Sequence, residues 1–257
     1  MLDLDNRDKT AVLARATGAR ARLTLRHVEP VHFPSFYTHE EVLPASFLDD
    51  RHITDLYLRP LEHLGVPVRT RECRLEARPE DVAAGRRRLG GARLLVHPGS
   101  RSAWRVWPAE RFAAVIDAAH AATGEPTAIV AGPGEQDTVE AVVRAARSPL
   151  VRIDANLPIP ALAGLFAAAR VLLCHDSGPM HLAAAVGTRV VALFGSQPLA
   201  VWRPLGDGHA ALQAPLPCAD CVAPDRCTPA DSYHNLCVRR LEPDRVAAAV
   251  RTALAAS

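Results

Sequence analysis

One short run of residues places an acid, a hydroxyl and a histidine around the start of a predicted helix: Asp176, Ser177 and His181. Asp176 and Ser177 come directly after the apolar run 171–174, which is typical of a strand buried on both faces. Ser177 is a good N-cap and Pro179 suits the first helical turn, so the spacing predicts a helix that begins here and ends before Gly187. The unpaired N–H groups at such a helix start attract phosphate. The run therefore predicts an anion site, and its simpler interpretation is a crossover in which Asp176 and Ser177 only cap the helix.

A second polar run, HPGSRSAWRVWP at 97–108, also lies between a predicted strand and a predicted helix. Gly99 lets a ligand approach the backbone closely, and Ser100 offers both a hydroxyl and an N–H group. Arg101 and Arg105 supply cations that could hold a diphosphate. The alternative interpretation is a polar surface loop whose tryptophans pack beneath it.

A third run, AGPGEQD at 131–137, has the glycines of a dinucleotide-binding loop but not their spacing. The G-x-G-x-x-G pattern requires glycine at position 137, where this chain has Asp137, so a nicotinamide cofactor is excluded on that ground. Glu135 could accept hydrogen bonds from ribose hydroxyls. The alternative is an acid in a first helical turn, where the helix dipole favours negative charge.

The elements around these runs alternate between strand and helix. Strands are predicted near residues 94, 128, 151, 171 and 190, with helices between most of them. Parallel strands need such crossovers, so the pattern predicts an α/β fold with a doubly wound parallel sheet over about 91–215. All three polar runs would then meet at one edge of that sheet. Upstream, helices are predicted at 8–17 and 51–64, a strand at 22–28 and a loop at 29–50.

Composition excludes several classes of protein. The formal charge of +2 gives no reason to expect nucleic acid as a partner. No apolar run reaches the ~18–20 residues that cross a bilayer, and the charged start MLDLDNRDKT lacks the apolar core of a signal peptide. We therefore expect a cytoplasmic protein.

Four cysteines are bunched near the C-terminus, separated by two, five and nine residues between successive thiols. In a cytoplasmic protein such a cluster favours a metal over disulfides, and a four-thiolate zinc site is one interpretation. The other is a set of reduced thiols, two of them buried. The four residues are Cys218, Cys221, Cys227 and Cys237.

The three polar runs together resemble glycosyltransferase family 9, the heptosyltransferase family. The resemblance rests on HPGSRSAWRVWP, AGPGE and HDSGPMHLAAAVGTRVVALFG, and it covers the chain from about residue 91 to the end. It implies a GT-B-like architecture: a partial N-terminal, acceptor-side α/β domain at 1–90 and a C-terminal Rossmann-like domain at 91–257 that binds the nucleotide-sugar and ends in a helix. It also implies inverting transfer of a heptose or related sugar, with ADP-heptose the expected donor, to a lipid-linked or saccharide acceptor, without a metal required for catalysis.

The resemblance also implies roles for individual residues. Arg105 stands where the family usually has Lys, two positions before W-P, and would neutralise the donor phosphates; with Asp176, which would contact the donor sugar, it is the expected catalytic pair. Glu135 would hold the nucleotide ribose. The remaining expected donor-binding residues are Gly99, Ser100, Ser177, Gly178, Met180 and His181.

The chain departs from the family at its front. Residues 2–23 resemble the middle of the family's first domain, so the aspartate that acts as general base is expected to be missing, and neither Asp3 nor Asp5 takes its place. Three explanations are open: a misplaced start codon, a separate partner chain that supplies the absent half, or a non-catalytic donor-binding module. Transfer to a small-molecule acceptor is a further alternative. The lipid-linked acceptor would place the protein at the inner face of the membrane.

Overall fold

The structure is a computed structural model that describes residues 1–101, 105–153, 156–215 and 236–256. It consists of two compact units, Met1–Arg71 and Glu72–Ser257. Within the described ranges, no helix combines the length and apolarity that crossing a bilayer requires.

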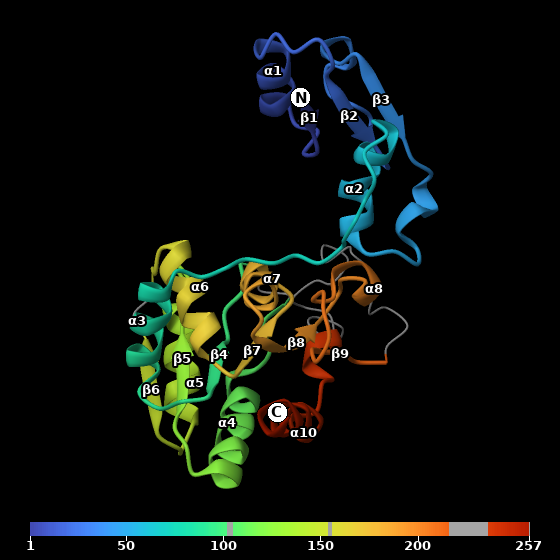
Figure 1. Cartoon of the computed structure of the whole chain (residues 1–257). Helices are drawn as coiled ribbons and strands as arrows, with labels where there is room; N and C mark the ends of the chain where they lie inside the picture. Colours follow the sequence, from blue (N-terminus) through green and yellow to red (C-terminus); the bar gives the residue numbers. More distant parts are fainter. Residues whose placement is uncertain (102–104, 154–155, 216–235, 257) are drawn as a thin grey trace. The chain divides into compact units, whose positions relative to one another are not determined.

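The first unit is a small parallel sheet with two α-helices and two short 3-10 helices (Figure 1). Its strands have the order β1-β2-β3 among the described residues, with Leu2 paired to Leu23 and Leu23 paired to His39. The elements are β1 Leu2–Asp3, α1 Asp8–Ala16, β2 Leu23–Arg26, η1 Pro34–Phe36, β3 His39–Val42, η2 Ala45–Leu48 and α2 Ile53–His63.

The prediction of a loop over 29–50 is wrong, because β3 lies inside that range. The four residues of β3, HEEV, are exposed or only partly buried on both faces. An edge strand of this kind shows no alternation of apolar and polar residues, which is the sequence signal for a strand. Its pairing with β2 comes from backbone hydrogen bonds and from an ion pair between Arg26 of β2 and Glu40 of β3, whose Nε and Oε1 atoms lie 2.6 Å apart.

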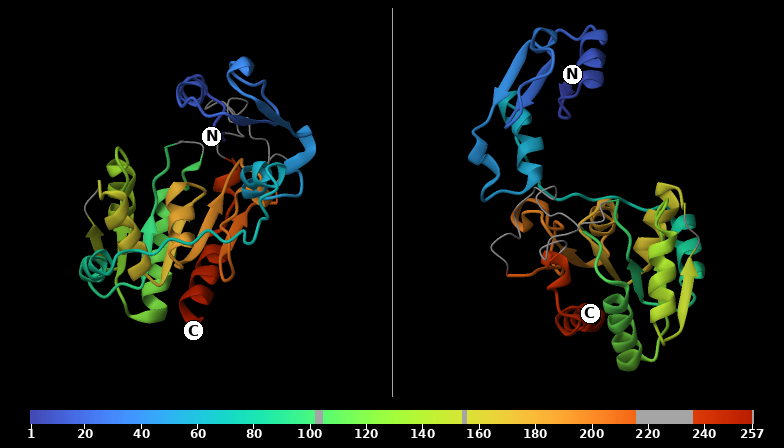
Figure 2. Two further views of the ribbon diagram at one scale, coloured as in Figure 1. Left: turned by 45° about the horizontal axis from the view of Figure 1, so that its top comes forward. Right: turned by 180° about the vertical axis from the view of Figure 1, so that it is seen from behind.

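The second unit is a doubly wound sheet of parallel strands, as the sequence predicts (Figure 2). The strand order among the described residues is β6-β5-β4-β7-β8-β9, so the direction of winding reverses between β4 and β7. The strands are β4 Leu94–His97, β5 Thr127–Val130, β6 Leu150–Ile153, β7 Val171–His175, β8 Arg189–Phe194 and β9 Ala210–Gln213. The helices are α3 Pro79–Leu89, α4 Ala109–Thr123, α5 Gln136–Ala145, α6 Ile159–Ala168, α7 Gly178–Ala185, α8 Leu199–Trp202, α9 Leu236–Arg239 and α10 Pro243–Ala255.

Successive residues of each central strand contribute to different cores, because side chains alternate across a sheet. In β7, Leu173 packs with α4 and α10 on one face, whereas Leu172 packs with α6 on the other. Both side chains are completely buried. Apolar burial on both faces explains the continuous apolar runs of β4, β5, β7 and β8.

Helix α3 belongs to the second unit, although sequence analysis assigns residues 1–90 to the first. It lies against α6 at a glycine crossing: a Cβ at Gly85 would come within 2.6 Å of the Gly164 carbonyl oxygen. The two glycines let the helix backbones approach closely. The two units consequently divide after Arg71, nineteen residues before the predicted boundary.

Candidate nucleotide-sugar site

A cavity of about 750 Å³ opens at the carboxyl ends of β4, β5, β6 and β7. This edge includes the point where the strand order reverses, which is where open α/β sheets bind ligands. The cavity has the size of a small-molecule site. Its lining residues are His97, Ser100, Arg101, Arg105, Ala131, Gly132, Pro133, Glu135, Asn156, Leu157, Leu162, Asp176, Ser177, Gly178 and Pro179.

Six of the nine predicted site residues line this cavity: Ser100, Arg105, Glu135, Asp176, Ser177 and Gly178. Gly99, Met180 and His181 do not. Gly99 lies against Glu135, Met180 is fully buried in the core, and His181 is a partly buried residue of α7. The three polar runs therefore converge on one site.

Arg105 and Asp176 join two of these runs across the cavity. The Arg105 Nη1 atom donates a hydrogen bond to the Asp176 carbonyl oxygen at 3.2 Å and lies 3.2 Å from Asp176 Oδ2 in an ion pair. The Asp176 side chain is only 6% exposed, whereas that of Arg105 is 30% exposed. Burial raises the pKa of Asp176, and the positive charge of Arg105 opposes that shift.

The carboxylate of Glu135 occupies a slot formed by two glycines and a histidine. Its Oε2 atom accepts a hydrogen bond from Gly132 N–H at 2.8 Å and lies 3.3 Å from Nε2 of His97. A Cβ at Gly99 would overlap this carboxylate, and a Cβ at Gly132 would lie 2.8 Å from it. Burial lowers the pKa of His97, while the negative charge of Glu135 opposes the shift. A carboxylate keeps acceptor capacity beyond these contacts.

Helix α7 starts at the cavity as predicted, but Ser177 does not cap it with its side chain. The Ser177 backbone is extended at the N-cap position, and its hydroxyl donates to the His175 carbonyl oxygen at 3.2 Å. Gly178 has open space where a Cβ would be. The first N–H groups of a helix lack intrahelical partners, so this end can receive an anion.

Sequence reasoning missed His97, His175 and the residues after β6. Asn156 and Leu157 follow β6 at the same sheet edge, and Asn156 has a left-handed backbone with φ 68°. The sequence could have indicated Asn156 and Leu157, because the carboxyl ends of all the parallel strands lie at the ligand-binding edge of the sheet. The two histidines close β4 and β7 within apolar runs, where a buried structural role is the usual expectation.

The predicted metal site falls mostly outside the described residues. Cys218, Cys221 and Cys227 lie outside the described residues, whereas Cys237 is buried in α9. Within the described residues, no group of three or more His, Cys, Asp or Glu side chains is placed to bind a metal ion.

Solved structures share this fold. A glycosyltransferase family 9 protein from Veillonella parvula aligns with a TM-score of 0.82 at 23% identity, covering 98% of this chain and 72% of that one. The ADP-heptose lipopolysaccharide heptosyltransferase II of Escherichia coli aligns with a TM-score of 0.77 at 15% identity, covering 98% and 75%. The fold thus defines a GT-B-like α/β protein.

Sequence comparison identifies the family. The profile described as glycosyltransferase family 9 (heptosyltransferase) matches residues 1–230, so the chain belongs to glycosyltransferase family 9. A curated relative, lipopolysaccharide heptosyltransferase 3 of Escherichia coli, is 27% identical over 214 residues. The match covers 79% of this chain and 61% of that relative.

Proposed function

We propose that this chain binds a nucleotide-sugar, with ADP-heptose the expected donor, and takes part in transferring its sugar to a saccharide or lipid-linked acceptor of lipopolysaccharide biosynthesis. The observation that carries the proposal is the convergence of Arg105, Glu135 and Asp176 on one cavity. Family membership and the heptosyltransferase activity for which the relatives are named support it.

In the proposed reaction, the oxygen of an acceptor hydroxyl attacks the anomeric carbon while the bond from that carbon to the diphosphate breaks, and the hydroxyl proton is lost to solvent. The diphosphate leaves with the bonding electrons, and direct displacement inverts the anomeric centre. Arg105 and the N–H groups at the start of α7 would stabilise the negative charge that the leaving group gains. Losing one such donor typically raises a barrier by about 3–4 kcal/mol.

The two carboxylates that line the cavity would hold the donor. Glu135, whose Oε2 already accepts from Gly132 N–H, keeps lone pairs for ribose hydroxyls. Asp176 would accept hydrogen bonds from sugar hydroxyls, and the positive charge of Arg105 favours the ionised carboxylate.

A donor-binding module without transfer is a second candidate, favoured by one observation. Of the carboxylates that line the cavity in the described residues, Glu135 is held by Gly132 and His97, and Asp176 by Arg105. Neither is poised to take the proton from an acceptor hydroxyl, which is the task of a general base.

Two assays on the same protein test these candidates. In a thermal-shift panel of ADP-, UDP- and GDP-sugars, we expect an ADP-sugar to raise the melting temperature most, and Glu135→Ala to reduce that rise. Release of ADP in the presence of a saccharide acceptor would support transfer, whereas binding without release would support the module. A panel in which no nucleotide-sugar stabilises the wild type would contradict both.

Other partners stay predictions of the sequence. Transfer to a small-molecule acceptor, location at the inner face of the membrane, a partner chain for the first unit and a zinc ion at the cysteine cluster receive no support from the described residues. Purification without added metal followed by elemental analysis would test the zinc ion directly.

A further inference from the structure

His175 is a fully buried histidine that bridges two backbone positions of the run 97–108. It is the last residue of β7, and its ring lies between Gly99 and Trp107. Nε2 of the ring is 2.8 Å from the Trp107 backbone nitrogen, and Nδ1 is 3.2 Å from the Gly99 carbonyl oxygen. Phe112 of α4 packs edge-on against the ring, with centroids 5.3 Å apart and planes at 90°.

These two contacts define the tautomer of His175. Because the Trp107 backbone N–H can only donate, Nε2 must be the unprotonated acceptor. The ring proton therefore sits on Nδ1 and donates to the Gly99 carbonyl oxygen. Burial lowers the pKa of His175 to about 4, and His97 and Arg105 act in the same direction, so the ring is neutral near pH 7.

Both bonded positions are adjacent to residues that line the cavity. The Gly99 carbonyl and the Ser100 N–H belong to one planar trans peptide, so holding the carbonyl toward His175 directs that N–H the opposite way. Trp107 is two residues after Arg105, and its indole Nε1 donates to the Leu241 carbonyl oxygen at 3.2 Å. Trp107 is completely buried, so it provides a fixed point from which the Arg105 side chain extends.

We propose that His175 is a positioning residue for the donor diphosphate. It ties the end of β7, which leads into Asp176, to Gly99 and Trp107, and so fixes Ser100 and Arg105 relative to the start of α7. The inference rests on the proposed function, since the diphosphate is part of that donor. His175 itself does not line the cavity.

Nucleotide titrations with ADP and adenosine as probes test this role. His175→Phe keeps a planar ring against Phe112 but removes both hydrogen bonds. We expect it to weaken ADP binding at least about tenfold, while adenosine, which lacks the diphosphate, changes less than about twofold. His175→Gln, whose amide oxygen can replace Nε2 as acceptor for Trp107, should recover most of the ADP affinity.

A double-mutant cycle shows whether His175 acts through Arg105. If it does, adding His175→Phe to Arg105→Ala should weaken ADP binding by less than about twofold further. His209→Phe is the matched control, because the His209 ring also accepts a backbone hydrogen bond, from Val190 N–H at 3.2 Å, but lies outside the cavity. This control should leave ADP affinity unchanged.

Hydrogen exchange at the Trp107 amide gives a readout that needs no ligand. Exchange should quicken in His175→Phe and stay slow in His175→Gln. Equal loss of ADP and adenosine binding in His175→Phe, or no loss of either, would overturn the inference and leave the proposed function standing. A wild type that binds neither ADP nor any ADP-sugar would overturn the proposed function, and the inference with it.

Discussion

Arg105 holds Asp176 by both its main chain and its side chain, with Nη1 3.2 Å from the carbonyl oxygen and 3.2 Å from Oδ2. One guanidinium group thus joins the run after β4 to the run after β7. In the same position it would meet the diphosphate of a donor. The guanidinium group that positions Asp176 would thus also bind the ligand.

The first prediction concerns this pair. Arg105→Ala should lower the free energy of unfolding by about 1–3 kcal/mol, because it leaves a buried carboxylate without its counter-charge. In an Asp176→Asn background the same change should cost less than about 1 kcal/mol. Urea unfolding of the four proteins at pH 7 measures the coupling. Equal costs in the two backgrounds would show that the ion pair contributes nothing.

The second prediction concerns the glycine slot of Glu135. Gly99→Ala would push the Glu135 carboxylate aside, since the new methyl group overlaps it. The lost hydrogen bond from Gly132 N–H should cost about 1 kcal/mol of stability, and adenosine should bind as weakly as it does to Glu135→Ala. Adding Gly99→Ala to Glu135→Ala should change adenosine binding no further. A further loss in that background would mean that Gly99 serves the ligand directly.

The third prediction is a pH dependence of stability. The pKa of His175 is about 4 in the folded protein, below the ordinary histidine value of 6.5, so the folded state binds fewer protons between these two pH values. Stability should therefore fall as the pH drops below 6.5, with this group contributing a loss of about 3 kcal/mol by pH 4. His97, whose pKa is also lowered, acts in the same direction.

Replacing the His175 ring isolates its contribution to the pH dependence of stability. His175→Asn should show a shallower decline in unfolding free energy between pH 6.5 and pH 4.5 than the wild type. The slope of the unfolding free energy against pH should differ between the two proteins by an amount that approaches the uptake of one proton on unfolding. Identical slopes would show that His175 is not held neutral by the fold.

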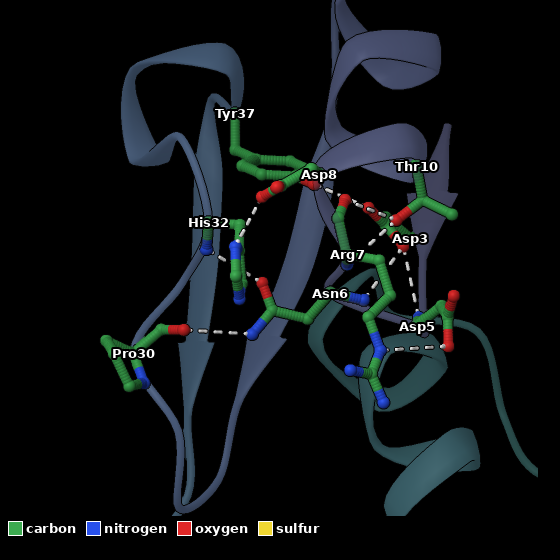
Figure 3. A network of polar contacts seen from close by, with 9 residues as sticks. All are labelled: Asp3, Asp5, Asn6, Arg7, Asp8, Thr10, Pro30, His32 and Tyr37. Carbon is green, nitrogen blue, oxygen red and sulfur yellow. Dashed lines mark hydrogen bonds and ion pairs between the residues drawn. The ribbon is translucent and has the colours of Figure 1, made fainter.

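The fourth prediction concerns the first unit, where Asp3 anchors a polar network (Figure 3). Its carboxylate accepts from the Tyr37 hydroxyl at 2.5 Å and from the backbone N–H groups of Asp5 and Asn6 at 3.0 and 3.2 Å. Although burial raises the pKa of Asp3, these hydrogen bonds outweigh it and hold the pKa below its ordinary value.

Tyr37→Phe should therefore destabilise the first unit by about 1–2 kcal/mol at pH 7. Because the pKa of Asp3 is lowered, the stabilisation is present above pH 3.8 and is lost as the pH falls through the folded-state pKa. Hydrogen exchange of the β1–β2 amides reports on this unit alone. An unchanged exchange rate at pH 7 would contradict the prediction.

The sequence predicted the second unit well because its signals are local. Buried strands appear as apolar runs, and polar residues at their ends mark the ligand-binding edge, so Ser100, Glu135 and Asp176 could be assigned to one site. The exposed strand β3 carries no such pattern and was missed. The packing of α3 on α6 also escaped prediction, because a contact between Gly85 and Gly164 leaves no periodic trace.

The contacts of the two buried histidines could not be predicted either, because they also join residues that are distant in the sequence. His97 contacts Glu135, and His175 contacts Gly99 and Trp107, so each ring meets residues far away in the chain, up to 76 positions distant. Spacing along the sequence shows which residues end a strand. It does not show which backbone group a buried ring will meet.

The central claim is that Arg105 and its neighbours hold a nucleoside diphosphate, and isothermal titration with ADP tests it most directly. Arg111 is the matched control: its side chain is also 30% exposed and its Nη1 also donates to a backbone carbonyl, that of Leu241, but it lies outside the cavity. We predict that the wild type and Arg111→Ala bind ADP with affinities within about twofold, and that Arg105→Ala binds at least about tenfold more weakly. Failure of the wild type to bind ADP, or equal affinities in Arg105→Ala and Arg111→Ala, would contradict the account.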